Sequence, residues 1–432
     1  MSRRPVRRPG ASARRRCLVL LGLLALTAPL ALPGTGWAQM PTGGAGAGAA
    51  TASNPHVSGI LTGNYASFSK DPAANPFHVP GFALGPDVAE GQGKPGFQLG
   101  ETELGLYSNI DPYWYGSIVL AFAPDAGASV EEAFIQSLAL PWGFIVKAGR
   151  FHSSIGYLNV FHRHADDFID TPLVYSAFLN GQLADDGAQL LWVAPTNFLL
   201  QLGGEFFNGG TWPASGAQNR GNGTNTQFID VADDVGVGGS YLLGISHVDS
   251  QAVDRVSNGP GGTPGNGLSF TGAGALNILS GVYKWAPLGD TAYTQLKLQA
   301  EVFSGDENGT YTVLDSSGAP SATAIDVKGS QHLVHSGWYA QTVLKFQQRW
   351  KVGARYSEVS TGRIQDPNAA GTALDAGTKT PNIASAMVEY WPSEFSQFRL
   401  QYSQDHTDPK QSVDVWYLQY IITMGAHAAH TY

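Results

Sequence analysis

The sequence predicts a transmembrane antiparallel β-barrel of about 16 strands, within a range of about 14 to 18, with short turns at one end and long loops at the other. Three observations carry this prediction: an export signal at the N-terminus, a hydrophobic pattern with a period of two, and a regular alternation of short and long connections. After the signal no run of 18 apolar residues is uninterrupted, so a membrane-spanning helix is not expected. Strands that close into a barrel are the alternative, because they pair every backbone group.

Residues 1–38 have the pattern of a secretory signal peptide. Seven arginines and no acidic residue precede an apolar run from Leu18 to about Leu32, and small residues at Gly36 and Ala38 suit a cleavage site. A flexible Gly/Ala-rich linker is expected over 39–55, and the barrel over 56–432. Without the signal, 18 basic and 34 acidic residues leave a net charge of about −16. That sign argues against nucleic acid as a partner, because phosphates are neutralised by Lys and Arg.

Apolar and polar residues alternate along the chain beyond the linker. In QLKLQAEV, Leu296, Leu298 and Ala300 share one face of a strand while Lys297 and Gln299 share the other. The same alternation occurs in WKVGARYS (350–357), SAMVEYW (385–391) and FRLQYS (398–403). This period is typical of strands with two different faces.

The connections sort into two classes that alternate along the chain. The short turns are 110–113, 141–142, 195–197, 286–290, 347–349 and 391–395, and the long segments are 69–95, 153–184, 208–223, 251–269, 305–335 and 361–380. Short periplasmic turns and long extracellular loops are typical of bacterial outer-membrane barrels. Sixteen strands fit between them, at 56–68, 97–109, 113–123, 129–140, 143–152, 185–194, 197–207, 224–234, 240–250, 270–285, 291–304, 336–346, 350–360, 381–390, 396–406 and 412–424.

Tryptophans gather near the predicted short turns. Those in or next to such a turn are Trp114, Trp142, Trp285, Trp350 and Trp391, and Trp192 is close to another. Amphipathic rings at one end of the strands predict an aromatic girdle at a lipid interface.

Four segments then resemble a known family. They are KAGRFHSSIGYLNVFHRHADDFIDTPLVYSAFLNGQLADDGAQL (147–190), GETELGLYSNIDPYWYGSIVLAF (100–122), MVEYWPSEFSQFRLQYS (387–403) and GAHAAHTY (425–432). They look like a porin-like family of proteobacterial outer-membrane barrels, distantly similar to the phosphate-selective porins, in which some relatives carry the label zinc-regulated TonB-dependent receptor. The resemblance implies an outer-membrane barrel of a Gram-negative bacterium that acts in transport. TonB-dependent receptors resemble larger barrels with a plug domain, and about 17 residues before the first predicted strand leave no room for one.

Residues 153–184 form the third long loop of the predicted barrel. In general porins the third loop folds into the lumen and sets the narrowest point, so by similarity this loop is the expected constriction. Its polar side chains are His162, His164, Asp166, Asp167 and Asp170. Three roles stay open for them: anchoring the loop, setting the charge of the lumen, and binding a metal ion.

Alternation also assigns charged residues of the strands to the lumen, because a charge on the lipid face is costly. The predicted basic residues of the lumen are Lys147, Lys284, Lys297, Lys345, Lys351, Arg355 and Arg399, and the acidic ones are Glu101, Glu103, Glu205, Glu301 and Glu389. Lys/Arg rings favour anions and Asp/Glu rings favour cations, so these residues leave the selectivity open. Salt bridges across the lumen are the structural alternative.

The sequence favours no enzyme. His162, His164, Asp166 and Asp167 read H-x-H-x-D-D, which lacks the last histidine of the metallo-β-lactamase pattern, and no strand–helix alternation surrounds them. His427 and His430 in the tail are further weak candidates for a metal, and no cofactor and no catalytic residue are expected.

The expected function is therefore a porin-like channel for passive diffusion of small hydrophilic solutes or ions, with anions among the candidates. A metal (zinc)-linked outer-membrane receptor or transporter is the alternative. The expected partners are outer-membrane lipid and small solutes or ions. Trimers are common among 16-stranded porins, so a homotrimer is a candidate, but the sequence itself shows no interface.

Overall fold

The computed structural model describes residues 55–75, 77–85, 88, 93–123, 127–216, 221–257, 267–329 and 332–425. The predicted signal peptide, the linker up to residue 54, and His427 and His430 lie outside the described residues. Among the described residues, no helix is long and apolar enough to span a membrane.

The strands form one antiparallel sheet that closes on itself. They are β1 (His56–Phe68), β2 (Gly96–Leu99), β3 (Thr102–Asn109), β4 (Trp114–Ala123), β5 (Gly127–Ser137), β6 (Phe144–His152), β7 (Ala184–Val193), β8 (Leu199–Phe207), β9 (Thr224–Val235), β10 (Gly239–Ser257), β11 (Leu268–Trp285), β12 (Gln295–Leu314), β13 (Pro320–Val327), β14 (Leu333–Gln347), β15 (Trp350–Thr361), β16 (Asn382–Ser393), β17 (Ser396–Asp405) and β18 (Val413–Gly425). The barrel closes where β18 pairs with β1, for example Ile60 with Thr423.

The closed ring has 16 positions, which confirms the predicted fold. β2 and β3 are two pieces of one strand, because both pair with β1, and β13 lies outside the ring because it pairs only with the upper part of β12. Below β13, β12 pairs directly with β14. All 16 predicted strands have a counterpart.

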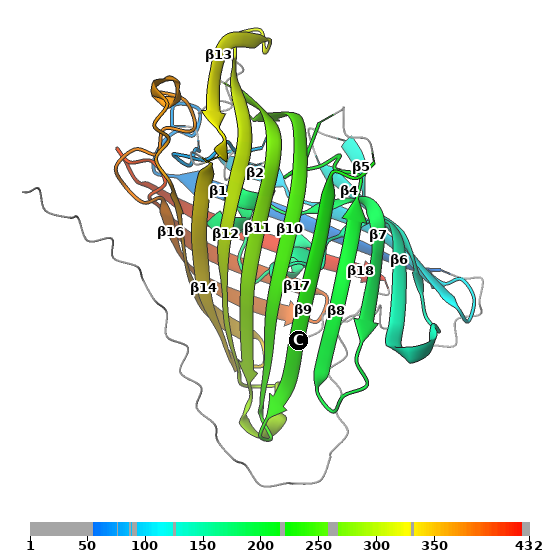
Figure 1. Ribbon diagram of the computed structural model, residues 1–432. Helices are drawn as coiled ribbons and strands as arrows, with labels where there is room; N and C mark the ends of the chain where they lie inside the picture. The colour runs from blue at the N-terminus through cyan, green and yellow to red at the C-terminus, as the bar shows by residue number, and fades with distance from the viewer. Residues whose placement is uncertain are drawn as a thin grey trace, which may run out of the picture. The chain divides into compact units, whose positions relative to one another are not determined.

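The described strands depart from the prediction mainly on the long-loop side. β10 runs to Ser257 and β12 to Leu314, so both extend into segments that were expected to be loops. β13 was missed. Figure 1 shows that β13 and the ends of β10, β11 and β12 rise above the neighbouring strands. Beyond the bilayer, lipid no longer imposes a period of two.

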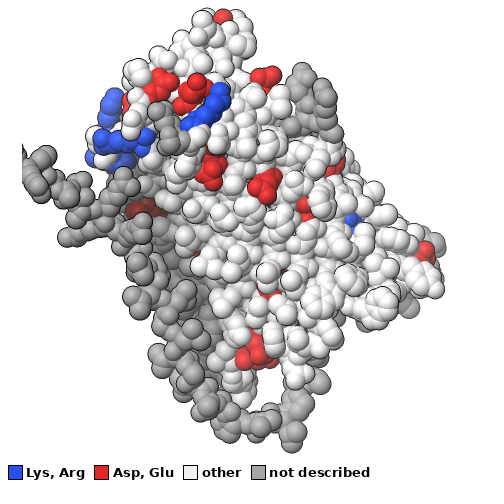
Figure 2. All heavy atoms as spheres, viewed as in Figure 1, with Lys and Arg blue, Asp and Glu red and all other residues white. Residues whose placement is uncertain are grey.

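The outer face of the barrel is apolar and the inner face is polar. On β12, the outward Leu298 and Val302 are 43% and 50% exposed, whereas Gln299 and Glu301 are buried inside the barrel. Figure 2 shows the result on one side: few charged side chains lie over the middle of the wall, and most of the visible Lys and Arg gather near the upper end. The outer apolar surface therefore suits a lipid bilayer.

Most of the girdle tryptophans lie where the prediction placed them. Trp114, Trp142, Trp285 and Trp350 are exposed near the short turns. Trp391 differs, because its indole donates a hydrogen bond to Glu389 Oε1 and lies under Lys351 Nζ at 5.0 Å. Trp391 thus faces the lumen with those two residues.

The apolar core lies inside the barrel. It joins helix α2 (Leu173–Leu179) and the segment around Val79, Phe82 and Leu84 to inward side chains of the wall such as Phe303 and Val359. The long connection between β6 and β7, residues 153–183, is therefore folded into the lumen, where the candidate site lies.

Candidate functional site

The segment of residues 153–183, called here the inward loop, crosses the lumen and is held by the wall on several sides. Its first contact is with Glu205 of β8, whose carboxylate accepts a hydrogen bond from the hydroxyl of Ser153 and one from the backbone N–H of Ser154 at 2.9 Å. Gln189 of β7 and Thr226 of β9 donate to the same carboxylate at 2.7 and 2.5 Å. Glu205 is fully buried, and these donors satisfy both oxygens of its carboxylate.

The second contact is with Glu301 of β12. Its carboxylate accepts hydrogen bonds from the backbone N–H of Tyr157 at 2.7 Å, from the hydroxyl of Tyr175 at 2.9 Å, and from the hydroxyl of Tyr339 of β14 at 2.5 Å. Tyr175 also accepts a hydrogen bond from the backbone N–H of Leu158 at 3.2 Å. Glu301 therefore joins the start of the inward loop, helix α2 and the wall.

The third contact is formed by two aspartates of the inward loop. Asp170 accepts a hydrogen bond from Arg355 of β15 at 2.5 Å and another from the side chain of Gln401 of β17. Asp167 forms an ion pair with Lys297 of β12 and accepts a hydrogen bond from Gln341 at 3.0 Å. These contacts lie on strands from β12 to β17, away from Glu205 of β8 in the ring.

The fourth contact is a cluster of histidines and glutamates. His164 Nδ1 lies 2.6 Å from Glu103 Oε1 of β3, and His162 lies 3.1 Å from Glu131 and 3.3 Å from Glu132, both on β5. The cluster has two further members at its margins. They are His152, whose ring centre is 5.1 Å from that of His162, and Glu101, which lies 3.8 Å from Arg163.

A β-bulge explains how two consecutive glutamates reach the same cluster. Val119 of β4 pairs with Glu132, but the next residue, Leu120, pairs with Val130, so Glu131 has no counterpart on β4. An extra residue of this kind shifts the alternation, because two residues oppose one. Without the bulge, Glu131 or Glu132 would face lipid.

Burial and the neighbouring charges shift the pKa values of the inward loop. Burial lowers the pKa of His162, but its contacts with Glu131 and Glu132 outweigh burial and hold that pKa well above its usual value. Burial raises the pKa of Asp166 to about 7. Burial also acts to raise the pKa of Asp167, but Lys297 and Lys351 outweigh it and lower that pKa. At neutral pH, His162 and Asp167 are thus charged.

The predicted basic residues of the lumen divide into two groups. Arg399 donates to Glu389 at 2.6 Å, and Lys351 lies 3.4 Å from the same carboxylate, so both are paired, as Lys297 and Arg355 are. Lys147, Lys284 and Lys345 form no ion pair with a described residue. Lys147 lies over the rings of Phe134 and Phe151, and Lys345 donates to the carbonyl oxygen of Thr291 at 3.0 Å.

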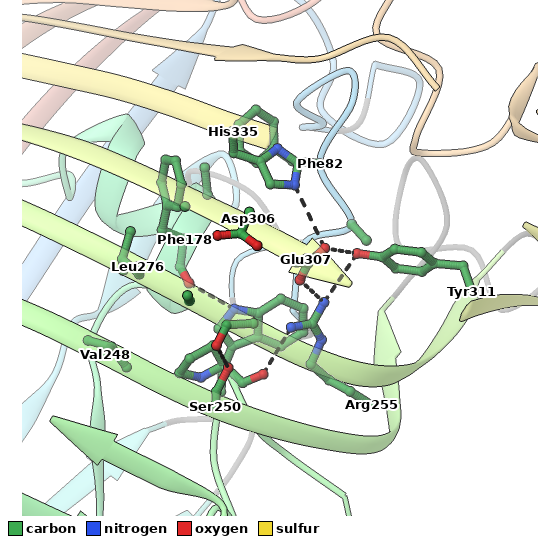
Figure 3. A pocket seen from close by; sticks show the side chains of 17 residues that line it. Phe82, Phe178, Val248, Ser250, Arg255, Leu276, Asp306, Glu307, Tyr311 and His335 are labelled. Carbon is green, nitrogen blue, oxygen red and sulfur yellow. Dashed lines mark hydrogen bonds and ion pairs between the residues drawn. The ribbon is translucent and has the colours of Figure 1, made fainter. Parts of the chain in front are cut away.

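A second polar group lies in the lumen above helix α2. It borders a small pocket of about 50 Å³, where Arg255 of β10, Tyr311 of β12 and His335 of β14 converge on Glu307, as Figure 3 shows. Arg255 also donates to the carbonyl oxygen of Pro213 at 2.9 Å and lies 4.1 Å from the centre of the Trp212 ring. This group anchors the segment between β8 and β9 to the wall.

The structure thus brings together residues that the sequence prediction kept apart. The predicted loop histidines meet Glu103, and the loop aspartates meet Lys297 and Arg355. Sequence reasoning missed Glu131, Glu132, His152 and the group around Glu307. The sequence did hold a signal for Glu131 and Glu132. Two consecutive glutamates in a predicted strand break the alternation of lipid-facing and lumen-facing residues, which indicates a bulge.

Comparison with known proteins gives one relative by sequence, and it shows that solved outer-membrane barrels share the fold of this chain. An Aquifex aeolicus protein with the name "Uncharacterized protein" is 30% identical over 367 residues, which cover 78% of this chain and 71% of the relative. No family model matches the chain.

Two solved structures illustrate the fold. The anion-selective porin from Comamonas acidovorans is 12% identical with a TM-score of 0.53, and 86% of this chain covers 99% of it. The trimer form of OmpT, an outer-membrane protein of Vibrio cholerae, is 8% identical with a TM-score of 0.50 over the same shares. At these identities the likeness establishes the barrel fold alone.

Proposed function

We propose that this chain, which belongs to the same family as the Aquifex aeolicus protein, is a porin-like channel in the outer membrane of a Gram-negative bacterium. It lets small hydrophilic solutes or ions diffuse passively. The observation that carries the proposal is the inward loop, which enters a closed barrel with a polar inner face and narrows it from within. No catalytic role is proposed for any residue.

The unpaired lysines support a preference for anions. The lumen carboxylates Glu205, Glu301 and Glu389 are occupied by hydrogen-bond donors or by cations of the wall. Lys147 and Lys284 have no carboxylate partner among the described residues, so they add a positive potential that solutes can meet. Basic side chains along a pore favour anions.

A homotrimer is the proposed assembly. The Vibrio cholerae OmpT structure is described as a trimer form, and this chain shares its fold. Chemical cross-linking of the purified protein in detergent, followed by mass measurement, tests this part on its own. A species with the mass of one chain alone overturns the trimer and leaves the channel proposal intact.

Conductance tests the channel. The purified, folded protein is added to a planar lipid bilayer, and discrete current steps are expected under an applied voltage. Their reversal potential across a KCl gradient is expected to indicate anions. Folding is checked first, as a change of gel mobility on heating. A folded barrel that inserts into vesicles and gives no current steps contradicts the proposal.

A further inference from the structure

Three side chains from different elements bring potential metal ligands together in the lumen. They are His162 of the inward loop, His152 at the end of β6 and Glu131 in the bulge of β5, and their ligand atoms all lie within 4.8 Å of one another. We infer that this cluster is a binding site for a divalent transition-metal ion of the zinc class, with His152, His162 and Glu131 as ligands and Glu103 as the fourth.

Three distances between these atoms are close to those of a tetrahedral site. His162 Nδ1 lies 3.1 Å from Glu131 Oε1 and 3.4 Å from Glu103 Oε2, and His152 Nε2 lies 3.6 Å from Glu131 Oε1. Zinc binds nitrogen and oxygen at about 2.0–2.2 Å, so two ligand atoms of a tetrahedral site lie about 3.3–3.5 Å apart. These three distances differ from that spacing by about 0.2 Å or less, and the ligand atoms of His152 and His162 lie within 4.8 Å of each other.

Two atoms of the cluster lack the hydrogen bond that their burial calls for. His162 Nδ1 and Glu131 Oε2 are inaccessible to solvent; Nδ1 lies 3.1 Å from Glu131 Oε1 without the geometry of a hydrogen bond, and Glu131 Oε2 has no hydrogen-bond partner among the described residues. Buried polar atoms without a partner are uncommon in folded proteins. A cation bound between these residues would satisfy His162 Nδ1 directly and would balance the charge of the carboxylate.

Two further side chains hold the proposed ligands in position. The other ring nitrogen of His162, Nε2, lies 3.3 Å from Glu132 Oε2, which orients the imidazole so that Nδ1 faces the centre. Glu103 is held in the same way by His164 at 2.6 Å from its second oxygen. Metal-bound histidines commonly donate their second N–H to a carboxylate, and such partners fix the ligand geometry.

His152 is also free to present its Nε2 lone pair. Its Nδ1 lies 3.4 Å from the side-chain nitrogen of Gln182, but that nitrogen donates its two hydrogens to the carbonyl oxygens of Asn159 and Phe161, each at 2.7 Å. No hydrogen remains for His152 Nδ1. This contact does not fix the tautomer of His152, and metal binding at Nε2 requires the proton on Nδ1.

The donor set selects the class of ion. Two imidazoles with carboxylates suit zinc and related first-row metals, whereas magnesium and calcium prefer oxygen alone. A bound ion would connect the inward loop, through His162, to β3, β5 and β6. The site does not depend on the channel proposal, since a barrel without conductance could still bind the ion.

Zinc binding to the full-length protein tests the inference. The protein is purified in detergent without an affinity tag, treated with a chelator, and titrated with Zn²⁺ in a calorimeter. One ion per chain is expected. Loading with Co²⁺ is expected to give the visible absorption of a tetrahedral site. His152→Ala and His162→Ala are each expected to weaken zinc binding by at least about tenfold.

Three comparisons make the outcome decisive. His247→Ala is the matched control, because His247 of β10 also lies beside a carboxylate, that of Asp249 at 3.2 Å, but outside this cluster. Glu131→Gln keeps the shape of the side chain and is expected to weaken binding while the barrel stays folded. His427→Ala with His430→Ala removes the tail histidines. The inference is overturned if the wild type binds no zinc, or if binding is lost only with the tail histidines. In that case a proton on His162 would balance the charge of the neighbouring glutamates.

Discussion

Arg355 of β15 and Asp170 of the inward loop form a 2.5 Å ion pair although 185 positions separate them in the chain. The side chain of Arg355 is 2% exposed and that of Asp170 is 10% exposed. The guanidinium also donates to the backbone carbonyl oxygen of Asp170 at 2.7 Å, so it holds the backbone of the loop as well as its side chain.

Breaking this pair is expected to release the inward loop. Asp170→Ala leaves the buried guanidinium without its carboxylate, and removing one partner of a buried pair costs about 3–5 kcal/mol. Limited proteolysis within residues 153–183 and a larger single-channel current are the expected results. Asp326→Ala, at an exposed site on β13, is the control and should change neither. A loop as resistant in Asp170→Ala as in the wild type would contradict this role.

Glu301 is expected to stabilise the folded loop as a buried hydrogen-bond acceptor. Glu301→Ala leaves the hydroxyls of Tyr175 and Tyr339 buried without an acceptor, at about 1–3 kcal/mol for each unsatisfied group. Glu301→Gln keeps one acceptor oxygen and should cost less. Heat-induced loss of the folded form on a gel compares both variants with the wild type, and equal loss in the two variants would contradict the role of the acceptor oxygen that Gln keeps.

The loop is expected to respond to pH through Asp166. Because burial raises the pKa of Asp166 to about 7, its ionised form is disfavoured in the folded state. The penalty is absent below the usual pKa of about 4, grows as the pH rises toward 7, and is fully present above 7. Asp166→Asn should remove it and make the loop more resistant to proteolysis at pH 8 but not at pH 4. Equal resistance of the two proteins at both values would refute this.

Ion selectivity is expected to depend on the unpaired lysines. Changing Lys147, Lys284 and Lys345 to Glu together should shift the reversal potential toward cations. Lys328→Glu, on an exposed side chain beyond β13, is the control. The paired residues Lys351, Arg355 and Arg399 are less suitable for this experiment, because their reversal would place like charges beside Glu389 or Asp170.

A charged side chain on the lipid face is expected to hinder folding of the barrel into a membrane. Leu298→Arg places a guanidinium on the outer face of β12, which costs about 2–4 kcal/mol near the middle of the bilayer. Folding into lipid vesicles should fall, whereas Val237→Arg at an exposed short turn should fold as the wild type does. Equal folding of both variants would show that Leu298 does not face lipid.

The sequence predicted the ring of strands because the bilayer imposes one rule on every strand. Leu298 and Val302 must face lipid, so their neighbours Gln299 and Glu301 face inward, and the alternation is visible in the sequence alone. The strands beyond the membrane-spanning ring were harder to predict. β13 lies outside the ring, so no such rule applies to it, and the end of β12 could not be foreseen for the same reason.

The candidate site was predicted in part. The sequence indicated an inward loop with His162, His164 and Asp170, but it could not identify their partners, since Glu131 reaches the cluster only through a bulge and Arg355 lies far away in the chain. Pairings of this kind depend on the closed ring, which brings strands of distant sequence to face the same space.

The distance in sequence between the inward loop and its partners also sets an order of assembly. Asp170 can meet Arg355 and Gln401 only after β15 and β17 have taken their places, although the loop itself lies in the first half of the chain. Contacts between distant segments form slowly, because the ends of long connections must first be brought together. The contacts of Asp170 therefore form after the last strands have taken their places, so their formation indicates that the barrel is complete.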